Sequence, residues 1–198
     1  MTSLRKTLQK VFRNVPGLKP SMVIGPGDVV KKKYNVLIVD EAHRLRQRRN
    51  IPNYGMFDKT NKHLGFDKSA DELDWVLNSA NQVILFYDEK QSVRPSDISP
   101  GRVAMHATQE FKLKQQIRVK GGDAYLELID SLLEGKKVER PELNEYDFQL
   151  YDDISQMVRD IKLREKEHSL ARVVAGYAWE WKSRTDASKY DIEIGKEK

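Results

Sequence analysis

Apolar positions recur along the chain in two spacings that predict two kinds of element. Spacings of three and four residues predict amphipathic helices in four segments: 3–13, 69–80, 125–133 and 154–161. Unbroken apolar runs predict strands buried on both faces, at 34–39, 83–87, 148–151 and 171–177. The alternation of strands with helices indicates an α/β protein with a mostly parallel sheet flanked by helices.

Polar residues, prolines and glycines mark the connections between these elements. Residues 46–68 are largely polar and contain one proline and two glycines, so we predict a long surface loop there. A capping box formed by Ser69 and Glu72 is expected to start the following helix. A Pro-Gly pair interrupts the pattern shortly before a predicted boundary between a first lobe, 1–108, and a second lobe, 109–198.

The composition fits a folded domain and excludes several chemistries. Apolar residues make up 39% of the 198 residues, which is enough for a hydrophobic core. The sequence contains no cysteine, which excludes disulfides, a thiol nucleophile and a Cys-ligated zinc site. Because no apolar run approaches the roughly 20 residues needed to cross a bilayer, we expect a cytoplasmic protein that does not act at a membrane.

The chain is mildly basic, and the distribution of its charges is more informative than their total. Lys and Arg number 35 against 30 Asp and Glu, a formal net charge of +5. Lysines occupy positions 31–33, and a denser basic run comprises Arg44, Arg46, Arg48 and Arg49. Such runs are most often solvated surface. Because the arginine run directly follows the sharpest motif of the chain, it is also a candidate for contact with nucleic-acid phosphates.

That motif is a pair of acids, Asp40 and Glu41, at the end of the strand predicted at 34–39. Ligands of α/β sheets bind at the carboxyl ends of the strands. In phosphoryl transfer, one acid can hold Mg²⁺ while its neighbour orients or deprotonates the attacking water. The alternative is a strand that ends in a polar turn, but the full string Val-Leu-Ile-Val-Asp-Glu-Ala-His favours the functional interpretation.

Two further motifs follow the acid pair along the chain. Asp88 and Gln91 follow the strand predicted at 83–87, where a glutamine amide can contact a γ-phosphate and the attacking water. Arg118, in the string Gln-Gln-Ile-Arg, can stabilise charge that develops on the transferred phosphoryl group. A capped turn and an ordinary surface arginine are the alternatives, and the order and spacing of the three motifs favour catalysis.

Together these motifs resemble the core of a superfamily-one helicase. Three longer strings, beginning at Val36, Tyr87 and Ala175, resemble the Schlafen-type family of predicted DNA/RNA helicases of bacteria and archaea. The strings are Val-Leu-Ile-Val-Asp-Glu-Ala-His-Arg-Leu-Arg, Tyr-Asp-Glu-Lys-Gln-Ser-Val-Arg-Pro and Ala-Gly-Tyr-Ala-Trp-Glu-Trp. The resemblance implies a RecA-like P-loop NTPase fold, here an incomplete first core plus the start of a second lobe, that acts on DNA or RNA.

The resemblance also implies a role for each motif residue, with ATP and Mg²⁺ as cofactors. The residues that would act on ATP are Glu41 as catalytic base, Gln91 as sensor of the γ-phosphate, and Arg118 as arginine finger. The residues that would bind the cofactors are Asp40, as the Mg²⁺ ligand, His43, which would couple the acid pair to the other motifs, and Asp88. For His43, a polar residue that starts a loop is the alternative.

The sequence departs from the family pattern because it lacks the phosphate-binding loop. No Gly-x-x-x-x-Gly-Lys-Ser/Thr string occurs in the 198 residues, and the loop at residues 25–28 lacks the lysine and the hydroxyl that hold phosphates and metal. A late arginine motif is absent as well. We therefore expect the chain to be the middle of a larger NTPase and to bind ATP weakly, hydrolysing none by itself. An incomplete core would leave apolar surface exposed and favour self-association.

Two tryptophans are weaker candidates for nucleic-acid contact, and two alternative functions remain for the chain. Trp179 and Trp181 could stack on nucleic-acid bases, although aromatic residues at a strand end more often belong to a core. The same fold could serve a regulatory or signalling ATPase that acts on proteins. A non-catalytic remnant that serves as a binding module is the third alternative. Salt-dependent binding to single strands separates the first function from the second.

Overall fold

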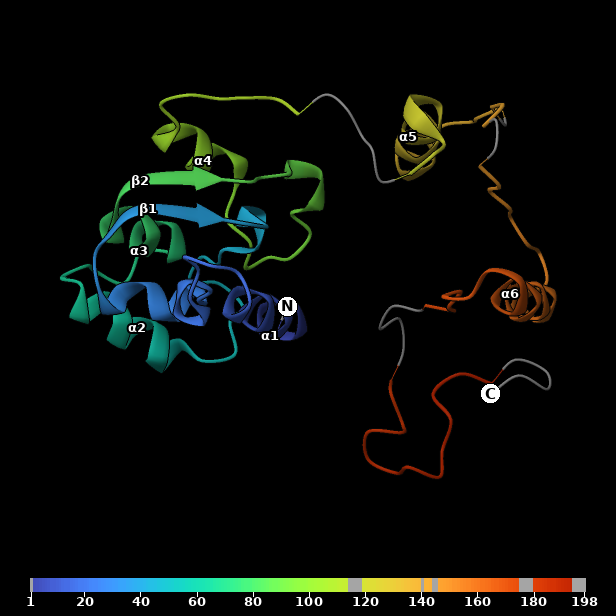
Figure 1. Cartoon of the computed structure of the whole chain (residues 1–198), viewed down its shortest axis with the longest axis horizontal. Helices are drawn as coiled ribbons and strands as arrows, with labels where there is room; N and C mark the ends of the chain where they lie inside the picture. The colour runs from blue at the N-terminus through green and yellow to red at the C-terminus, as the bar shows by residue number, and fades with distance from the viewer. Residues whose placement is uncertain (1, 114–118, 140, 144–145, 175–179, 194–198) are drawn as a thin grey trace. The chain divides into compact units, whose positions relative to one another are not determined.

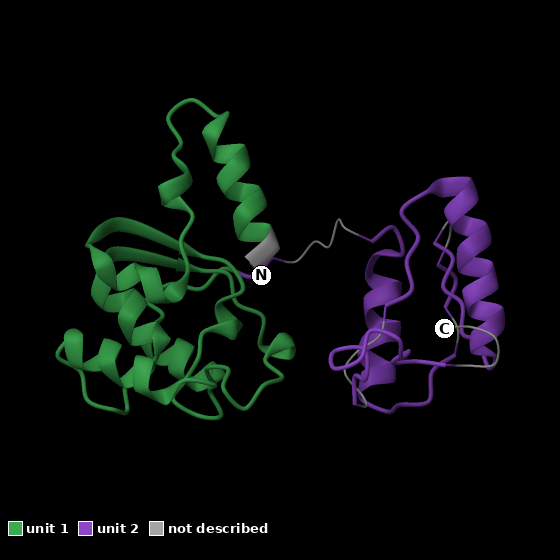
Figure 2. Cartoon of the chain, turned by 90° about the horizontal axis from the view of Figure 1, so that it is seen from below, with its two compact units in different colours: residues 1–111 green, residues 112–198 purple. Residues whose placement is uncertain are grey.

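The structure is a computed structural model that describes residues 2–113, 119–139, 141–143, 146–174 and 180–193. The chain forms two compact units, residues 1–111 and 112–198 (Figure 2). With η denoting a 3₁₀ helix, the first unit contains α1 (Thr2–Arg13), η1 (Pro20–Met22), η2 (Pro26–Lys31), β1 (Tyr34–Val39), η3 (Ala42–Arg44), α2 (Tyr54–His63), α3 (Glu72–Ser79), β2 (Ala80–Leu85), η4 (Glu89–Gln91) and α4 (Pro100–His106) (Figure 1). The second unit contains α5 (Gly122–Leu133) and α6 (Ile154–His168).

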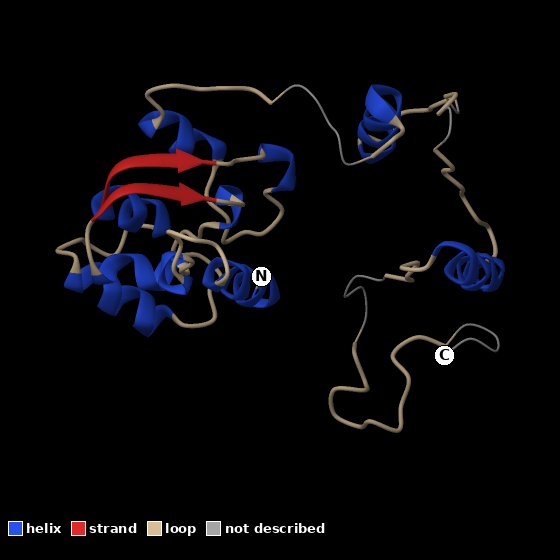
Figure 3. Cartoon of the chain, in the orientation of Figure 1, coloured by secondary structure: helices blue, strands red, loops and turns tan. Residues whose placement is uncertain are grey.

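A two-stranded parallel sheet forms the centre of the first unit, and helices flank it (Figure 3). The register pairs Tyr34 of β1 with Ala80 of β2 and Val39 with Leu85. Parallel neighbours need a crossover connection, which here runs through α2 and α3. The predicted α/β class with a parallel sheet is thus confirmed for this unit.

The two faces of the sheet differ in burial. One face, with Leu37 and Val39 of β1 and Val83 and Leu85 of β2, packs against the hydrophobic core. On the other face, apolar side chains keep between 48% and 66% of their surface exposed: Val36, Ile38, Ile84 and Phe86. The prediction that these strands are buried on both faces was wrong, because the core cluster of this unit covers only one side of the sheet.

Residues 46–68 do not form the predicted long loop, because α2 (Tyr54–His63) lies in the middle of that stretch. The Asn53 side chain caps the helix by accepting a hydrogen bond from the amide of Met56 (2.9 Å). Phe57 and Asn61, one turn apart, are buried; Phe57 packs on Trp75 of α3 with 4.6 Å between ring centroids. The Asn61 side chain accepts a hydrogen bond from the Trp75 indole, which satisfies a polar group inside the core.

The helix that follows starts at a different capping box from the one predicted. Asp71, not Ser69, is the N-cap: its side chain accepts from the amide of Asp74 (3.1 Å), and the Asp74 side chain accepts from the amide of Asp71 (2.8 Å). Ser69 instead bonds to the side chain of Asp67. Glu72 is thereby freed from capping and is buried within the unit.

The second unit agrees with the predicted helices but not with a predicted strand. The helices expected at 125–133 and 154–161 are present as α5 and α6. Residues 148–151 form no strand; Phe148 and Tyr146 instead pack edge-on against Tyr125 of α5, with centroids 5.9 and 5.0 Å away. Residues 171–174 also form no strand, and the rest of the strand predicted at 171–177 lies outside the described residues.

The helix predicted at 3–13 is confirmed as α1. Among the helices that the structure describes, none is both long and apolar enough to cross a membrane.

Candidate functional site

The acids that follow β1 and β2 lie at the same edge of the sheet. The strands run parallel and end side by side at Val39 and Leu85. Backbone hydrogen bonds continue past both ends, because the amide of Phe86 donates to the carbonyl of Val39 (2.9 Å) and the amide of Ala42 donates to the carbonyl of Phe86 (2.8 Å). These bonds fix the turn that carries Asp40 and Glu41 against the chain that leads to Asp88.

Glu41 adopts a left-handed backbone conformation directly after β1. Its φ of 53° and ψ of 45° lie in a region that costs a non-glycine residue roughly 1–2 kcal/mol. Its amide donates to the carboxylate of Asp40 (3.0 Å), and its own carboxylate lies 3.1 Å from Nε2 of His43. Asp40 is exposed while the Glu41 side chain keeps 31% of its surface exposed, so adjacent acids meet different surroundings. Backbone strain of this kind is typical of functional turns.

Buried His43 and half-buried Tyr87 form a polar pair next to this turn. His43 is 2% exposed, and its ring meets Tyr87 edge-on with 6.3 Å between centroids. Within the described residues, neither ring nitrogen of His43 nor the hydroxyl of Tyr87 makes a hydrogen bond, and the 3.1 Å approach of the Glu41 carboxylate to His43 Nε2 is a charge contact only. Burial raises the pKa of Tyr87, and the nearby carboxylates of Glu89 and Asp88 raise it further. A buried polar atom without a partner costs free energy, so a group that hydrogen-bonds to His43 or Tyr87 would bind favourably here.

Asp88 and Gln91 form a capped turn after β2. The Asp88 carboxylate accepts from the amide of Lys90 (3.0 Å) and from the side-chain amide of Gln91 (2.8 Å). Gln91 is exposed, and its donor group is thus held by Asp88. To donate to a phosphate, the Gln91 amide must leave Asp88, whereas its carbonyl oxygen can accept from a water without that change.

A buried carboxylate, Asp97, joins the loop after β1 to the loop after β2. One of its oxygens accepts from the guanidinium of Arg44 (3.0 Å) and from the amides of Val93 (3.2 Å) and Arg94 (3.0 Å). The side chain of Gln47 donates to the backbone carbonyl of Asp97 (3.0 Å). The sequence gives no signal that singles out this aspartate, because its importance comes from contacts between loops that are about 50 residues apart in the chain.

Three of the four arginines in the basic run form ion pairs inside their own unit. The pairs are Arg44 with Asp97, Arg46 with Glu72 and Arg48 with Asp58. Glu72 is 1% exposed and accepts from both the amide and the guanidinium of Arg46 (2.9 Å and 2.6 Å). Hydrogen bonds from Arg48 hold the pKa of Asp58 below its ordinary 3.8. Contact with nucleic acid stays a prediction for all four.

Arg49 differs from its neighbours in the run. Its side chain is exposed, and no carboxylate of the described residues lies within ion-pair distance of it. Its positive charge is therefore available to a ligand, whereas the charges of the other three are offset locally.

Three other predicted residues lie outside the first unit or outside the described residues. Arg118 and Trp179 are not described, and Trp181 is a half-buried residue of the second unit. In the part of the chain that the structure describes, no three His, Asp or Glu side chains gather as a metal site. Mg²⁺ in nucleotide sites needs only one or two carboxylates in addition to phosphate oxygens, a role that the exposed carboxylate of Asp40 suits.

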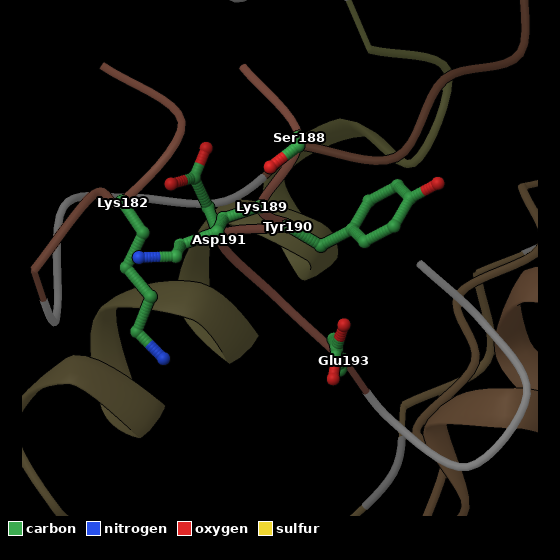
Figure 4. Close-up of a pocket in the computed structure, with 6 residues that line it drawn as sticks. All are labelled: Lys182, Ser188, Lys189, Tyr190, Asp191 and Glu193. Atoms are coloured by element: carbon green, nitrogen blue, oxygen red, sulfur yellow. The ribbon is translucent and has the colours of Figure 1, made fainter. Parts of the chain in front are cut away.

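The second unit contains a pocket that involves none of the predicted residues (Figure 4). Its lining residues are Lys182, Ser188, Lys189, Tyr190, Asp191 and Glu193. Asp191 accepts a hydrogen bond from the amide of Ser183 (2.7 Å), and the bonds from Ser183 lower the pKa of Asp191. These contacts close the loop on itself, so we assign them a structural role.

A family model matches nearly the whole of this chain. Residues 3–198 match the Schlafen group 3 DNA/RNA helicase domain. An uncharacterized protein of Saccharomyces cerevisiae is 23% identical over 204 residues, which cover 89% of this chain and 42% of the yeast protein. The chain thus spans less than half the length of that relative. No solved structure matches the chain.

Proposed function

The chain belongs to the Schlafen group 3 DNA/RNA helicase domain family, and we propose that it is part of an ATP-dependent, helicase-like P-loop NTPase that acts on DNA or RNA. The observation that supports this proposal most is the shared sheet edge, where Asp40–Glu41 and Asp88 follow the ends of two parallel strands. This edge is where α/β proteins bind their ligands. The family description favours nucleic acid over the alternative of an ATPase that acts on proteins.

The hydrolytic centre in this proposal is the turn after β1. Mg²⁺, when bound with ATP, supplies positive charge that offsets the charge of the phosphoryl group. Asp40 offers an exposed carboxylate for it, and Glu41 orients the attacking water and accepts its proton. Gln91 exchanges its bond with Asp88 (2.8 Å) for contact with the γ-phosphate. His43, 3.1 Å from Glu41 and buried, positions the base.

Because the 198 residues contain no phosphate-binding loop, we expect no ATPase activity from this chain by itself. The backbone amides, the lysine and the hydroxyl of such a loop supply most contacts to nucleotide phosphates. We therefore propose that the isolated chain binds Mg-ATP weakly and does not turn it over. The fold in this proposal is a portion of a RecA-like core.

The test of this site is binding resolved by residue, which needs no turnover. Titration of the ¹⁵N-labelled chain with Mg²⁺ and a slowly hydrolysed ATP analogue is expected to shift the amide resonances of residues 40–43 and 88–91. Asp40→Asn should remove these shifts, whereas Asp152→Asn, an exposed aspartate of the second unit, should leave them unchanged. Shifts that do not depend on Asp40, or that arise only in the second unit, would contradict the site.

A hydrolysis assay tests the second part of the proposal separately. No Mg²⁺-dependent release of phosphate is expected from the isolated chain. If the wild-type chain hydrolyses ATP and Glu41→Gln abolishes this hydrolysis, the proposed site is supported and the expected inactivity of the isolated chain is wrong. Turnover that survives Glu41→Gln would show that Glu41 is not the catalytic base.

A further inference from the structure

The first 33 residues carry a charge that the rest of the chain does not share. They contain eight Lys and Arg against one Asp, a formal charge of +7. Residues 34–198 contain 27 basic against 29 acidic residues, a formal charge of −2. The mild total of +5 therefore hides a strongly basic segment that comprises α1, η1 and η2.

Three of the four cations of α1 lie along one side of the helix. Lys6, Lys10 and Arg13 are spaced four and three residues apart, which places them on successive turns of the same face. With a rise of about 1.5 Å per residue, Lys6 and Lys10 are separated by about 6 Å along the axis. All three side chains are exposed, and no carboxylate of the described residues lies within ion-pair distance of them.

The helix extends away from the body of its unit. Figure 2 shows the helix that starts at the N-terminus projecting from the rest of the first unit, with the chain returning beside it. The side chain of Gln9 donates to the carbonyl of Val23 (2.9 Å) and ties the returning segment to α1. The apolar residues Leu4, Leu8 and Val11 occupy the opposite face from the cations and keep 37–48% of their surface exposed.

The single acid of the segment neutralises little of this charge. Asp28 lies 2.6 Å from the ammonium of Lys31 and 3.9 Å from the guanidinium of Arg5, so two cations share one carboxylate. The hydrogen bond from Lys31 lowers the pKa of Asp28, which keeps the acid ionised and the pair intact. Lys6, Lys10 and Arg13 take no part in this arrangement.

We propose that the cationic face of α1, defined by Lys6, Lys10 and Arg13, binds the backbone phosphates of single-stranded nucleic acid. This inference rests on the proposed function for its class of ligand, but it does not require ATP hydrolysis. A row of cations that follows a phosphate backbone is how sequence-independent proteins hold single strands. A basic amphipathic helix also suits an anionic membrane, but α1 contains no Trp or Tyr, and Leu4, Leu8 and Val11 are each less than half exposed.

The test compares two triple variants of equal net charge. In the first, Lys6→Gln, Lys10→Gln and Arg13→Gln neutralise the cationic face of α1. In the second, the control, Lys59→Gln, Lys62→Gln and Lys68→Gln neutralise three exposed lysines of the same unit. Binding to a fluorescein-labelled oligothymidine and oligouridine of about 20 nucleotides is followed by anisotropy, from about 50 to 200 mM salt.

The first variant is expected to bind between tenfold and 100-fold more weakly at about 100 mM salt, and the slope of log K against log salt should fall by about 2. The control should match the wild-type chain. Equal binding by both variants would overturn the site while leaving the nucleic-acid function in place. No binding by the wild-type chain at about 50 mM salt would overturn both. Wild-type binding to phosphatidylcholine vesicles with about 30% phosphatidylserine, without binding to either oligonucleotide, would overturn the choice of ligand.

Discussion

Two groups of cations in the first unit look alike in the sequence and have opposite surroundings in the structure. The arginines at 44–49 are the densest basic run of the chain, yet three of the four are bound to carboxylates of their own unit. The cations on one face of α1, Lys6, Lys10 and Arg13, are more widely spaced, yet no carboxylate of the described residues pairs with them. The first group stabilises the fold, and the second remains available to an anionic ligand.

The difference follows from where each group lies relative to buried acids. Glu72 and Asp97 lie inside the core region, where an ionised carboxylate is stable only beside a cation. Residues 44–48 pass directly over these acids on their way from β1 to α2, whereas α1 projects from the unit. Local charge density therefore indicates a binding surface only where the fold leaves the charges unpaired.

The largest effect is expected from Arg46→Met, which leaves the carboxylate of Glu72 buried without its guanidinium partner. Breaking a buried pair in this way typically costs 3–5 kcal/mol, and because the side chain of Arg46 is 44% exposed we expect a smaller loss of about 2–3 kcal/mol in the free energy of unfolding. Urea denaturation at neutral pH measures it. Binding to single strands should stay within about twofold of wild type while the chain is folded.

Arg49→Met is the matched control, since Arg49 belongs to the same run and lacks an ion pair within the described residues. Its change in unfolding free energy should be below about 0.5 kcal/mol. The double variant Arg46→Met with Glu72→Met should recover much of the lost stability, because it removes both buried charges. A double variant that is less stable than Arg46→Met would show that Glu72 contributes through something other than this pair.

A smaller, pH-dependent effect is expected from Asp58→Asn. The pKa of Asp58 in the folded chain lies below the ordinary 3.8 because Arg48 donates hydrogen bonds to it. The pair therefore contributes stability above about pH 4, and this contribution is lost as the pH falls through the lowered pKa of Asp58. Wild type should exceed Asp58→Asn in urea midpoint at pH 7, and the difference should shrink at pH 3; a difference that grows toward low pH would contradict the pair.

The smallest effect is expected from Arg49→Gln, which tests whether any part of the arginine run contacts nucleic acid. If Arg49 neutralises one phosphate, the salt slope for a single strand should fall by about 0.7, with no change in stability. Anisotropy titrations of Arg49→Gln and of the α1 triple variant under the same conditions compare the salt slope that each substitution removes. An unchanged slope would restrict the cationic surface of this unit to α1.

Periodicity along the chain was a good guide wherever one face of an element packs locally. The helix at 3–13, β1 and the two helices of the second unit lie where the spacing of apolar residues predicts them. The helix α2 was missed because one of its two buried positions is a polar residue, Asn61, whose place in the core depends on the indole of Trp75. The prediction of a strand at 148–151 was wrong because Phe148 packs against Tyr125 of α5 and these residues pair with no strand.

The sequence by itself determined β1, the helices α1, α5 and α6, the acids that follow two strands and the family to which they point. These features are local, since they depend on the spacing of side chains along a helix or strand. Only the tertiary structure decided which charges are free. The partners of Arg44, Arg46 and Arg48 come from 10 to 53 residues away, and an ion pair depends on distance in space, which spacing along the chain does not report.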